Sequence, residues 1–246
     1  MSVRERQLAH GRHFLRSSAL AAELVQAAGV EPGDLVLDIG AGAGALSAAL
    51  VRAGADTVAI ELDPVLAARL RSRFPRVVEC DALTVPLPRD PFRVVANLPF
   101  AVGTSILRRL LRPETALLSA DVIVDWRLAD KRAAVWPTTR VGVEWTTWFR
   151  LELVRRLPRC CFAPPPSVDA AVLRASRRDE PLAAVDEAAR YRRFLERGFR
   201  DGIRSLVPPR TLKRLANDLG FDRRAAPRDL DARQWAAVYQ HMKRAC

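Results

Sequence analysis

Between Leu35 and Trp126 the chain alternates short runs of β-branched and aliphatic residues with segments whose apolar residues recur at helical spacing. This alternation is typical of β-α-β units, which build a parallel sheet. The runs are apolar almost throughout, as expected for strands covered by helices on both faces. We predict strands at Leu35 to Ile39, Thr57 to Glu61, Arg76 to Glu79, Phe92 to Ala96 and Leu117 to Val124, and helices at Ala45 to Ala53, Pro64 to Arg73 and Gly103 to Leu111.

Two later extended runs, Phe149 to Leu153 and Val168 to Arg174, flank a proline-rich segment at Phe162 to Pro166. We expect them to close the sheet as a hairpin, which gives an α/β fold with about seven strands. After Arg178 the composition changes to helix formers with apolar residues at helical spacing. The sequence therefore predicts a sheet domain over residues 1–178 and a small all-α domain over residues 179–246.

The charge balance favours a polyanionic partner. Lysine and arginine number 40 against 28 aspartate and glutamate residues, a net charge of +12, and of these 17 basic and 10 acidic residues lie in residues 175–246. Such an excess suits nucleic acid or an anionic membrane surface. Only three of the cations are lysines, a skew that a GC-rich genome also produces, so the arginine count alone identifies no partner.

Neither a membrane segment nor a metal site is predicted. No run approaches the roughly 18 apolar residues that cross a bilayer, and Met1 to Gly11 has no apolar signal-peptide core, so we expect a cytoplasmic protein. The cysteines and histidines show no metal-ligand spacing, and we expect neither zinc nor a disulfide. We expect the adjacent Cys160 and Cys161 to be buried as small apolar residues.

A glycine-rich segment, Asp38 to Gly44, directly follows the first predicted strand and opens a helix. Glycines there let the backbone turn tightly and approach a ligand closely. The G-x-G-x-G spacing alone leaves a nicotinamide dinucleotide open as the ligand. Glu61 ends the second strand, where a carboxylate can accept both ribose hydroxyls, and Asp81 with Ala82 ends the third, where a carboxylate can accept from an adenine amino group. Together these loops predict one nucleoside site.

The fourth strand ends in Asn97-Leu98-Pro99-Phe100. Pro99 lacks a backbone donor and stiffens the turn, which leaves carbonyls near Leu98 and the Asn97 side chain as acceptors beside an aromatic face. An exocyclic amine on a purine needs that combination, because two acceptors help the nitrogen rehybridise while the ring holds the base flat. Asn-x-Pro alone is a common turn signal. After the fourth strand of this series, it indicates a site for an amino-bearing base.

These residues resemble the successive motifs of S-adenosylmethionine-dependent ribosomal RNA adenine-N6 methyltransferases. The resemblance runs from about His13 to Trp235, and it includes Phe162-Ala163-Pro164-Pro165-Pro166-Ser167-Val168-Asp169. The Leu-Pro-Phe form and the ending at Gly220 to Trp235 look most like the Erm enzymes of macrolide resistance, which act on 23S ribosomal RNA. The KsgA-type small-subunit dimethylases are the close alternative. The resemblance implies a Rossmann-like class I methyltransferase sheet that binds the cofactor and a helical domain that binds RNA.

The resemblance also implies a role for each site residue. Gly40 and Gly42 approach the methionine part of the cofactor, Glu61 holds its ribose, and Asp81 with Ala82 holds its adenine. Asn97, next to the cofactor, contacts the target amine together with Leu98 and Pro99. Phe100 stacks on the target adenine and Phe162 covers it from the other side. No metal takes part, and we expect the protein to act as a monomer.

One motif departs from the family pattern. The family has Gln-Asn-Phe-Leu near its N-terminus, and this chain has Arg12-His13-Phe14-Leu15. His13 and Leu15 can still contact the cofactor if that contact uses backbone atoms. A contact that needs the Gln or Asn side chain is not available to this chain.

The periodicity of the C-terminal part predicts an RNA surface. At 100° per residue a group of arginines falls on one side of a helix, opposite a stripe of Leu195, Phe199, Ile203 and Leu206. A solvated face with local ion pairs is the alternative, since Glu196 with Arg200 is at i,i+4 spacing. We interpret the ridge as a phosphate contact made by Arg190, Arg193, Arg197, Arg200 and Arg204.

Three functions remain in competition. The first is methylation of one adenine of 23S ribosomal RNA, which confers resistance to antibiotics that bind there. The second is a housekeeping small-subunit dimethylase, and the third is a catalytically idle RNA-binding factor of the same fold. The presence of Gly40, Glu61, Asp81 and Asn97 speaks against the third.

Overall fold

The computed structural model describes residues 13–133 and 139–244, which form two compact units. The sheet unit ends at Asp130 and resumes over Glu152–Ser176, and the helical unit consists of Lys131–Leu151 and the chain from Arg177. The helical unit thus takes in a segment upstream of the predicted domain at 179–246. The reason is visible in its contacts, because Leu182 N donates to the Thr147 carbonyl and the Trp148 indole donates to the Ala183 carbonyl.

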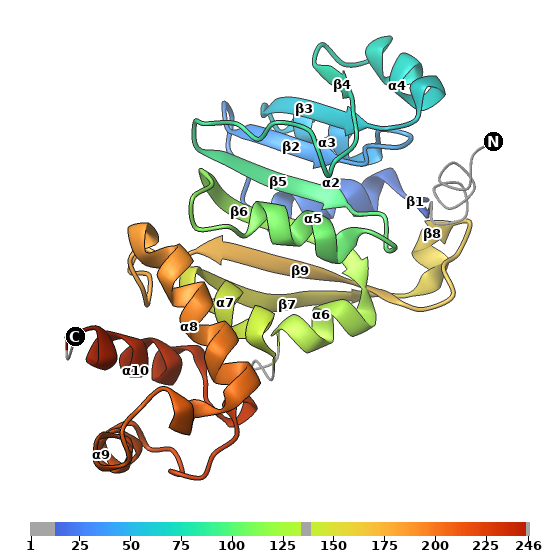
Figure 1. Ribbon diagram of the computed structural model, residues 1–246. Coiled ribbons are helices and arrows are strands. Elements are labelled where there is room, and N and C mark those ends of the chain that lie inside the picture. Colours follow the sequence, from blue (N-terminus) through green and yellow to red (C-terminus); the bar gives the residue numbers. More distant parts are fainter. Residues whose placement is uncertain (1–12, 134–138, 245–246) are drawn as a thin grey trace. The chain divides into compact units, whose positions relative to one another are not determined.

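The sheet has seven strands in the order β4-β3-β2-β5-β6-β9-β7 (Figure 1). The first five are parallel, and β9 runs antiparallel to β6, so the predicted seven-stranded α/β fold is confirmed. Each predicted strand is present, with ends that differ by a few residues. The strands are β2 (Leu35–Ile39), β3 (Asp56–Glu61), β4 (Val77–Glu79), β5 (Phe92–Asn97), β6 (Leu117–Asp125), β7 (Phe149–Leu157) and β9 (Ala170–Arg177).

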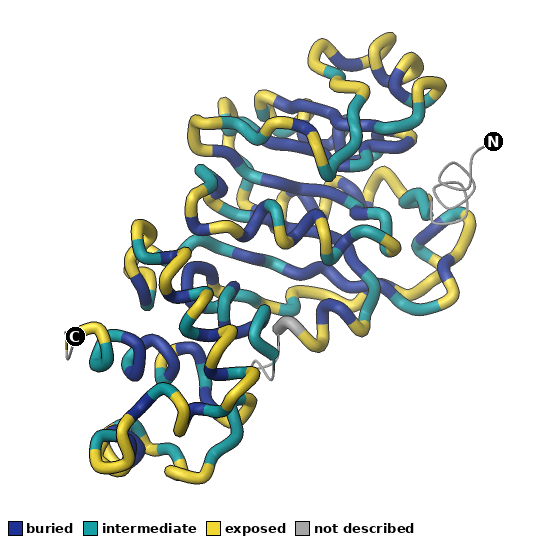
Figure 2. Tube along the Cα trace, viewed as in Figure 1, coloured by how far each residue is buried: buried dark blue, intermediate teal, exposed yellow. Residues whose placement is uncertain are grey.

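Helices cover both faces of this sheet. Figure 1 shows α5 in front of the strands and α2 behind them, and the strand interiors between are buried in Figure 2. Local signals set the helix starts: Ser17 caps α2, and the Asp63 carboxylate accepts from the Val65 and Leu66 amides at the start of α4. The helices of this part are α2 (Ser18–Ala27), α3 (Ala45–Arg52), α4 (Pro64–Arg71), α5 (Gly103–Leu110) and α6 (Trp126–Ala133).

A second, two-stranded sheet joins the N-terminal end of the described chain to the proline-rich segment. Strand β1 (Phe14–Leu15) pairs antiparallel with β8 (Phe162–Ala163), which follows a short 3₁₀ turn at Arg159–Cys161. Phe14 lies opposite Ala163, and Leu15 lies opposite Phe162. Neither strand was predicted, because a two-residue pairing leaves no periodic pattern in the sequence.

The helical unit is built around aromatic side chains. Trp148, Tyr191 and Trp235 are fully buried, and the Tyr191 ring meets the edges of Trp148 and Tyr239 at centroid distances of 5.7 and 5.0 Å. Gly198 is required on the helix because a Cβ there would lie 2.4 Å from Trp235. Its helices are α7 (Arg140–Trp148), α8 (Ala188–Asp201), α9 (Pro209–Leu219) and α10 (Ala232–Arg244), with 3₁₀ turns at Val185–Glu187, Ile203–Ser205 and Pro227–Asp229.

Helix α8 is shorter than the arginine periodicity predicted. It ends at Asp201, and Gly202 at φ 82° turns the chain into the 3₁₀ segment that holds Arg204. Arg204 is therefore not on the ridge with Arg190, Arg193, Arg197 and Arg200, although all five are exposed. The prediction of one continuous ridge was wrong because helical phase has no meaning beyond a glycine at positive φ.

Two features of the described residues bear on the remaining predictions. Cys160 is exposed and Cys161 half-buried, so the expectation that both are buried was wrong; they lie in a short 3₁₀ turn rather than in a strand. Across residues 13–133 and 139–244, no helix combines the length and apolar character needed to cross a membrane.

Candidate active site

A cleft lies at the carboxyl ends of strands β2, β3, β4 and β5. Ligands of open α/β sheets bind at this edge because the loops after successive strands converge there. Ten of the residues singled out from the sequence line it: His13, Gly40, Gly42, Glu61, Asp81, Ala82, Asn97, Leu98, Pro99 and Phe100. The tertiary structure thus brings together residues separated by up to 87 positions in the chain.

The loop after β2 needs glycine for two reasons. Gly40 and Gly42 both have positive φ, at 75° and 56°, and a Cβ on either would meet a neighbour. On Gly42 it would lie 2.6 Å from the Phe14 ring, and on Gly40 it would lie 3.3 Å from the Pro99 ring. Side chains at these positions would fill the space beside the backbone, so the loop forms a cradle that only glycine leaves open.

Glu61 is held rigidly at the end of β3. It is 6% exposed, its Oε2 accepts from the Gly42 amide at 2.8 Å, and its Oε1 accepts from the Asp63 amide at 2.9 Å. Each carboxylate oxygen has a further lone pair, so Glu61 can accept two more hydrogen bonds from a diol. Asp81 is half-buried on the next loop, and its Oδ1 accepts from the Leu83 amide at 2.9 Å.

A second carboxylate lies beneath the glycine loop. Asp38 is 1% exposed at the end of β2, and the Ser47 hydroxyl donates to its Oδ2 at 2.6 Å. Burial raises the pKa of Asp38 to about 7, and the nearby Glu61 carboxylate raises that pKa further, against the hydrogen bonds from Ser47. The glycine loop therefore rests on a group whose charge changes near neutral pH.

Asn97 presents an acceptor with no partner. Its Nδ2 donates to the main-chain carbonyl of His13 at 2.6 Å, and because a carbonyl only accepts, this contact fixes which way the amide faces. Oδ1 of Asn97 is buried and has no hydrogen-bond partner among the described residues. A buried acceptor without a partner costs about 1–3 kcal/mol, which a bound donor would recover. Leu98, Pro99 and Phe100 continue the same cleft wall.

His13 joins three parts of this site. Its carbonyl holds Asn97, its Nδ1 lies 2.9 Å from the Pro164 carbonyl and so carries the hydrogen, and its ring lies 5.4 Å from that of Phe100. His13 thus gives Asn97 a main-chain contact and Phe100 an aromatic neighbour. Leu15 packs against the core cluster and lines a smaller adjoining pocket rather than the cleft.

Phe162 does not reach the cleft. It is 0% exposed and belongs to the core cluster formed by α2, α3 and the sheet. Alternate residues of a strand face opposite sides, and in the β1–β8 pair Phe14 lines the cleft while Leu15 and its partner Phe162 face the core. The predicted position of Phe162 over a target base was therefore wrong for this structure.

Sequence reasoning gave no role to several residues that line the cleft. Phe14 covers the glycine loop, and apolar side chains and one thiol complete the wall, namely Ile60, Leu62, Cys80, Val102 and Ile106. Apolar residues next to a polar motif carry no signal of their own, because core positions look the same in a sequence. The alternation of Phe14 and Leu15 about a short strand would have been the only available signal for Phe14.

The donor set fits an organic nucleoside better than a metal. Among residues 13–133 and 139–244, no three His, Cys, Asp or Glu side chains are grouped to hold a metal ion. The glycine cradle, the Glu61 carboxylate and the apolar wall at Leu62 and Ile106 suit a ribose and a flat base. The unpartnered Asn97 Oδ1 suits a group with N–H hydrogens.

Comparison with known proteins agrees with this geometry. The family model described as ribosomal RNA adenine dimethylase matches residues 4–217. The chain is 32% identical over 240 residues to the mycinamicin-resistance protein MyrB of Micromonospora griseorubida, covering 94% of this chain and 77% of that one. It is 31% identical to ribosomal RNA small subunit methyltransferase A of Thermosynechococcus vestitus, covering 95% of each chain.

Among solved structures, the chain is similar to the 23S rRNA methyltransferase ErmE, with a TM-score of 0.83 and 26% identity over 94% of this chain and 99% of that one. The likeness extends through the helical part as well as the sheet, because nearly the whole of both chains is covered. The predicted class of enzyme and the α/β fold are confirmed by these matches. This chain belongs to the ribosomal RNA adenine dimethylase family and is a methyltransferase.

Proposed function

We propose that this enzyme transfers a methyl group from S-adenosylmethionine to the exocyclic N6 of one adenine in 23S ribosomal RNA and thereby confers resistance to macrolide-type antibiotics. The observation that carries the proposal is the buried, unpartnered Oδ1 of Asn97 in a cleft that also contains Phe100. An acceptor beside an aromatic face is what an adenine amino group requires, and a phosphate or a carboxylate substrate would not use it.

The cleft residues support S-adenosylmethionine as the cofactor. The two free lone pairs of Glu61 suit the ribose hydroxyls, Asp81 with Ala82 suits the adenine edge, and Gly40 and Gly42 leave room for the methionine part. His13 lies close by through its main chain. When bound, the cofactor supplies an electrophilic methyl group on a sulfonium. The chain then has to orient the acceptor nitrogen and exclude water, which are contributions of position rather than of acid–base strength.

Asn97 and the following turn orient the target nitrogen. Oδ1 of Asn97 accepts one N6 hydrogen, and the Leu98 carbonyl, which has no main-chain donor among the described residues, accepts the other. Both contacts favour a nitrogen whose lone pair has left the purine ring, which is the nucleophilic form. The target base has to leave its stack to reach this site, and Phe100 replaces part of the lost stacking, worth about 1–3 kcal/mol.

The choice of 23S over small-subunit RNA is supported by the relatives. MyrB is named for mycinamicin resistance and ErmE for 23S rRNA, and ErmE matches the fold over the helical part. The alternative, a small-subunit dimethylase, is favoured by one observation, since methyltransferase A aligns over 95% of both chains. The exposed arginines of α8 (Arg190, Arg193, Arg197 and Arg200) are proposed to meet the RNA backbone in either case.

Transfer of a tritiated methyl group from S-adenosylmethionine to naked 23S and to naked small-subunit RNA tests the proposal. We expect label in 23S RNA only, at a single adenine located by primer extension, and a raised macrolide tolerance in a susceptible bacterium that expresses the chain. The Asn97→Ala variant is the matched control, because it leaves the ribose site at Glu61 intact.

Label in small-subunit RNA alone would replace the proposal with the alternative. Tight RNA binding with no label in either RNA would instead support a catalytically idle factor of the same fold.

A further inference from the structure

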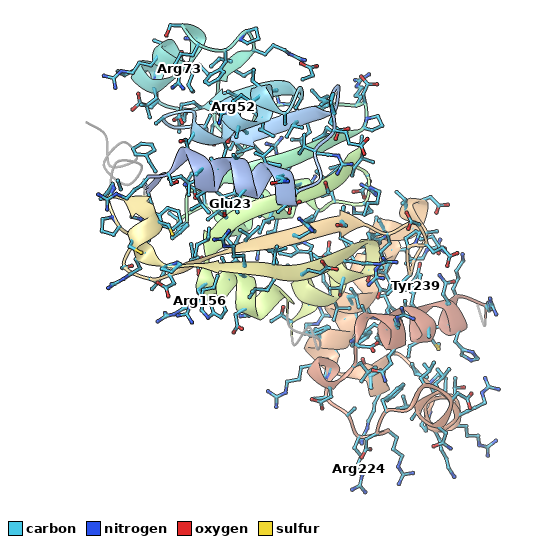
Figure 3. All side chains as sticks on the ribbon, turned by 180° about the vertical axis from the view of Figure 1, so that it is seen from behind. Glu23, Arg52, Arg73, Arg156, Arg224 and Tyr239 are labelled. Atoms are coloured by element: carbon cyan, nitrogen blue, oxygen red, sulfur yellow. The ribbon has the colours of Figure 1, made fainter. Side chains whose placement is uncertain are left out.

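The helical unit contains a basic groove that is separate from the arginine face of α8. Two buried apolar residues of the lining, Val207 and Leu212, form the floor of this groove. Five cationic side chains line it, all exposed and none accompanied by an acidic residue in the lining: Arg204, Arg210, Lys213, Arg223 and Arg224. In the view of Figure 3, Arg224 projects outward from the loop that follows α9.

Three chain segments converge to form this groove. Gly202 turns the chain after α8 and so directs Arg204 here, and the first two turns of α9 supply Arg210 and Lys213. The loop after α9 supplies Arg223 and Arg224. No periodicity in the sequence relates these positions, which is why only the ridge on α8 was predicted.

One arginine of the ridge, Arg200, has an ion-pair partner among the described residues, whereas the cations of the groove have none. Arg200 on the ridge forms a two-point ion pair with Asp201, and Arg197 lies within electrostatic range of the same carboxylate. In contrast, Arg204, Arg210, Lys213 and Arg223 make no ion pair with any described residue. Asp222, the acidic residue that precedes Arg223 in the sequence, accepts from the Arg224 amide at 2.6 Å and is not part of the lining.

The start of helix α9 adds to the positive potential. Its N-cap is Pro208, which gives no side-chain cap, and its first turn contains no acidic residue. A helix N-terminus carries a partial positive charge, and most helices offset it with an acidic or hydroxyl side chain. Here the uncompensated end and the five cations occupy the same groove.

We propose that this groove binds the sugar–phosphate backbone of RNA. Arginine forks match phosphate oxygens in a two-point geometry, and an uncompensated basic groove gains affinity by releasing counterions from a polyanion. The lining contains no aromatic ring on which a base could stack, so the groove supplies affinity and register but no sequence preference. The proposal builds on the proposed function, because the RNA it holds is the substrate of the cleft.

The salt dependence of RNA binding tests the groove without requiring turnover. The probe is a fluorescein-labelled RNA hairpin, and its Kd for the full chain is measured by anisotropy over a KCl series. We expect the triple variant Arg204→Ala, Arg210→Ala, Arg223→Ala to bind about tenfold more weakly or worse and to flatten the slope of log K against log salt by about two units.

Two further variants control the result. The triple variant Arg190→Ala, Arg193→Ala, Arg197→Ala removes the same charge from exposed positions of α8 that do not line the groove, and for that reason we expect a smaller change in slope. The triple substitution Arg204→Lys, Arg210→Lys, Arg223→Lys keeps the charge, and we expect it to retain the slope. The midpoint of urea unfolding, followed by the fluorescence of the buried Trp148 and Trp235 of the helical unit, should be equal in all three, which verifies that each variant folds.

An unchanged slope in the groove variant would overturn the proposal, and so would equal changes in the two alanine variants, because total charge alone would then explain them. Loss of binding to phosphatidylserine vesicles without any change for RNA would overturn it in favour of a membrane surface. If the wild-type chain labels no rRNA yet the groove variant loses slope, the proposed function fails and the groove stands. If the wild-type chain methylates rRNA and the groove variant keeps its slope, the proposed function stands and the groove proposal fails.

Discussion

The cleft of the sheet unit and the groove of the helical unit recognise ligands by opposite means. In the cleft, main-chain groups fix the geometry. Its glycines have positive φ, the Glu61 carboxylate is held by two main-chain amides, and Asn97 is held by a main-chain carbonyl. The groove is defined by exposed cations from three segments. The cleft has directional contacts at fixed positions, whereas the groove has charge without direction.

This difference explains how one chain can combine selectivity with affinity. Directional hydrogen bonds discriminate between bases but need a base already delivered to them, since the target adenine is out of its stack only when bound. Phosphate contacts act on any RNA and lose strength with salt, whereas buried contacts are screened much less. Variants of the two regions should therefore have different effects. Cleft variants should change turnover, and groove variants should change the salt dependence of RNA binding.

The largest effect is expected for Asn97→Ala. The variant loses the acceptor at Oδ1, so we expect turnover to fall by at least about 10²–10³-fold, the cost of removing one fixed polar contact to the reacting group. Cofactor affinity should stay within a few fold and the salt slope of RNA binding should not change. Single-turnover methyl transfer and equilibrium binding measure both.

Asn97→Asp separates the two halves of the amide, because it keeps an oxygen and loses the donor to His13. If Asn97→Ala turned over as fast as the native chain, the cleft would act without this acceptor. The proposed difference between a directional cleft and a non-directional groove would then be wrong.

A second effect separates the two phenylalanines. Phe100→Ala should lower kcat/KM by the loss of about 1–3 kcal/mol of stacking, with a smaller loss of stability than Phe162→Ala, because Phe100 is half-buried at the edge of the core cluster. Phe162→Ala should lower the free energy of unfolding by about 3–5 kcal/mol, because Phe162 is part of the core. Urea unfolding and steady-state kinetics distinguish them. If a Phe162→Leu variant kept its stability but lost as much activity as Phe100→Ala, Phe162 would have to contact the substrate.

A smaller effect is expected from the glycine cradle. Gly42→Ala and Gly29→Ala both place a side chain at similar positive φ, 56° and 62°, which costs about 1–2 kcal/mol of stability in each. Only at Gly42 does the methyl group also collide with Phe14. We therefore expect about tenfold weaker cofactor binding, equivalent to about 1.4 kcal/mol, for Gly42→Ala alone, measured by calorimetry. Equal affinities in the two variants would mean that Phe14 does not shape the cradle.

A further effect is a pH dependence of stability that arises in the sheet unit. The pKa of Asp38 is 3.8 in its ordinary state and about 7 when buried, so the folded chain binds a proton that the unfolded chain has released between these values. Stability from this group is complete below pH 3.8 and falls as pH rises towards 7. We expect Asp38→Asn to remove that fall, measured by urea unfolding at several pH values. Parallel curves for the two proteins would contradict the raised pKa.

Much of the cleft could be predicted because its residues follow strand ends in chain order. Gly40, Glu61 and Asn97 each directly follow or end a strand, Asp81 lies two residues after one, and parallel strands put those ends at one edge. The sequence could not show whether Phe14 and Phe162 face the cleft or the core, because strands of two residues, such as β1 and β8, are too short for an alternating pattern. The role of His13 depended on where its carbonyl lies, which no side-chain identity specifies.

The sequence by itself determined the alternating α/β architecture, the strand-end motifs and the excess of charge near the C-terminus, because these depend on local pattern and on residue type. Only the tertiary structure decided which arginines share a surface and which aromatic rings face the cleft. Arg204 lies beyond Gly202, where the helix with the predicted ridge has ended. Phe162 pairs with Leu15 and faces the core instead of the cleft. Both outcomes depend on the direction of a short segment of backbone, which is set by packing against distant residues.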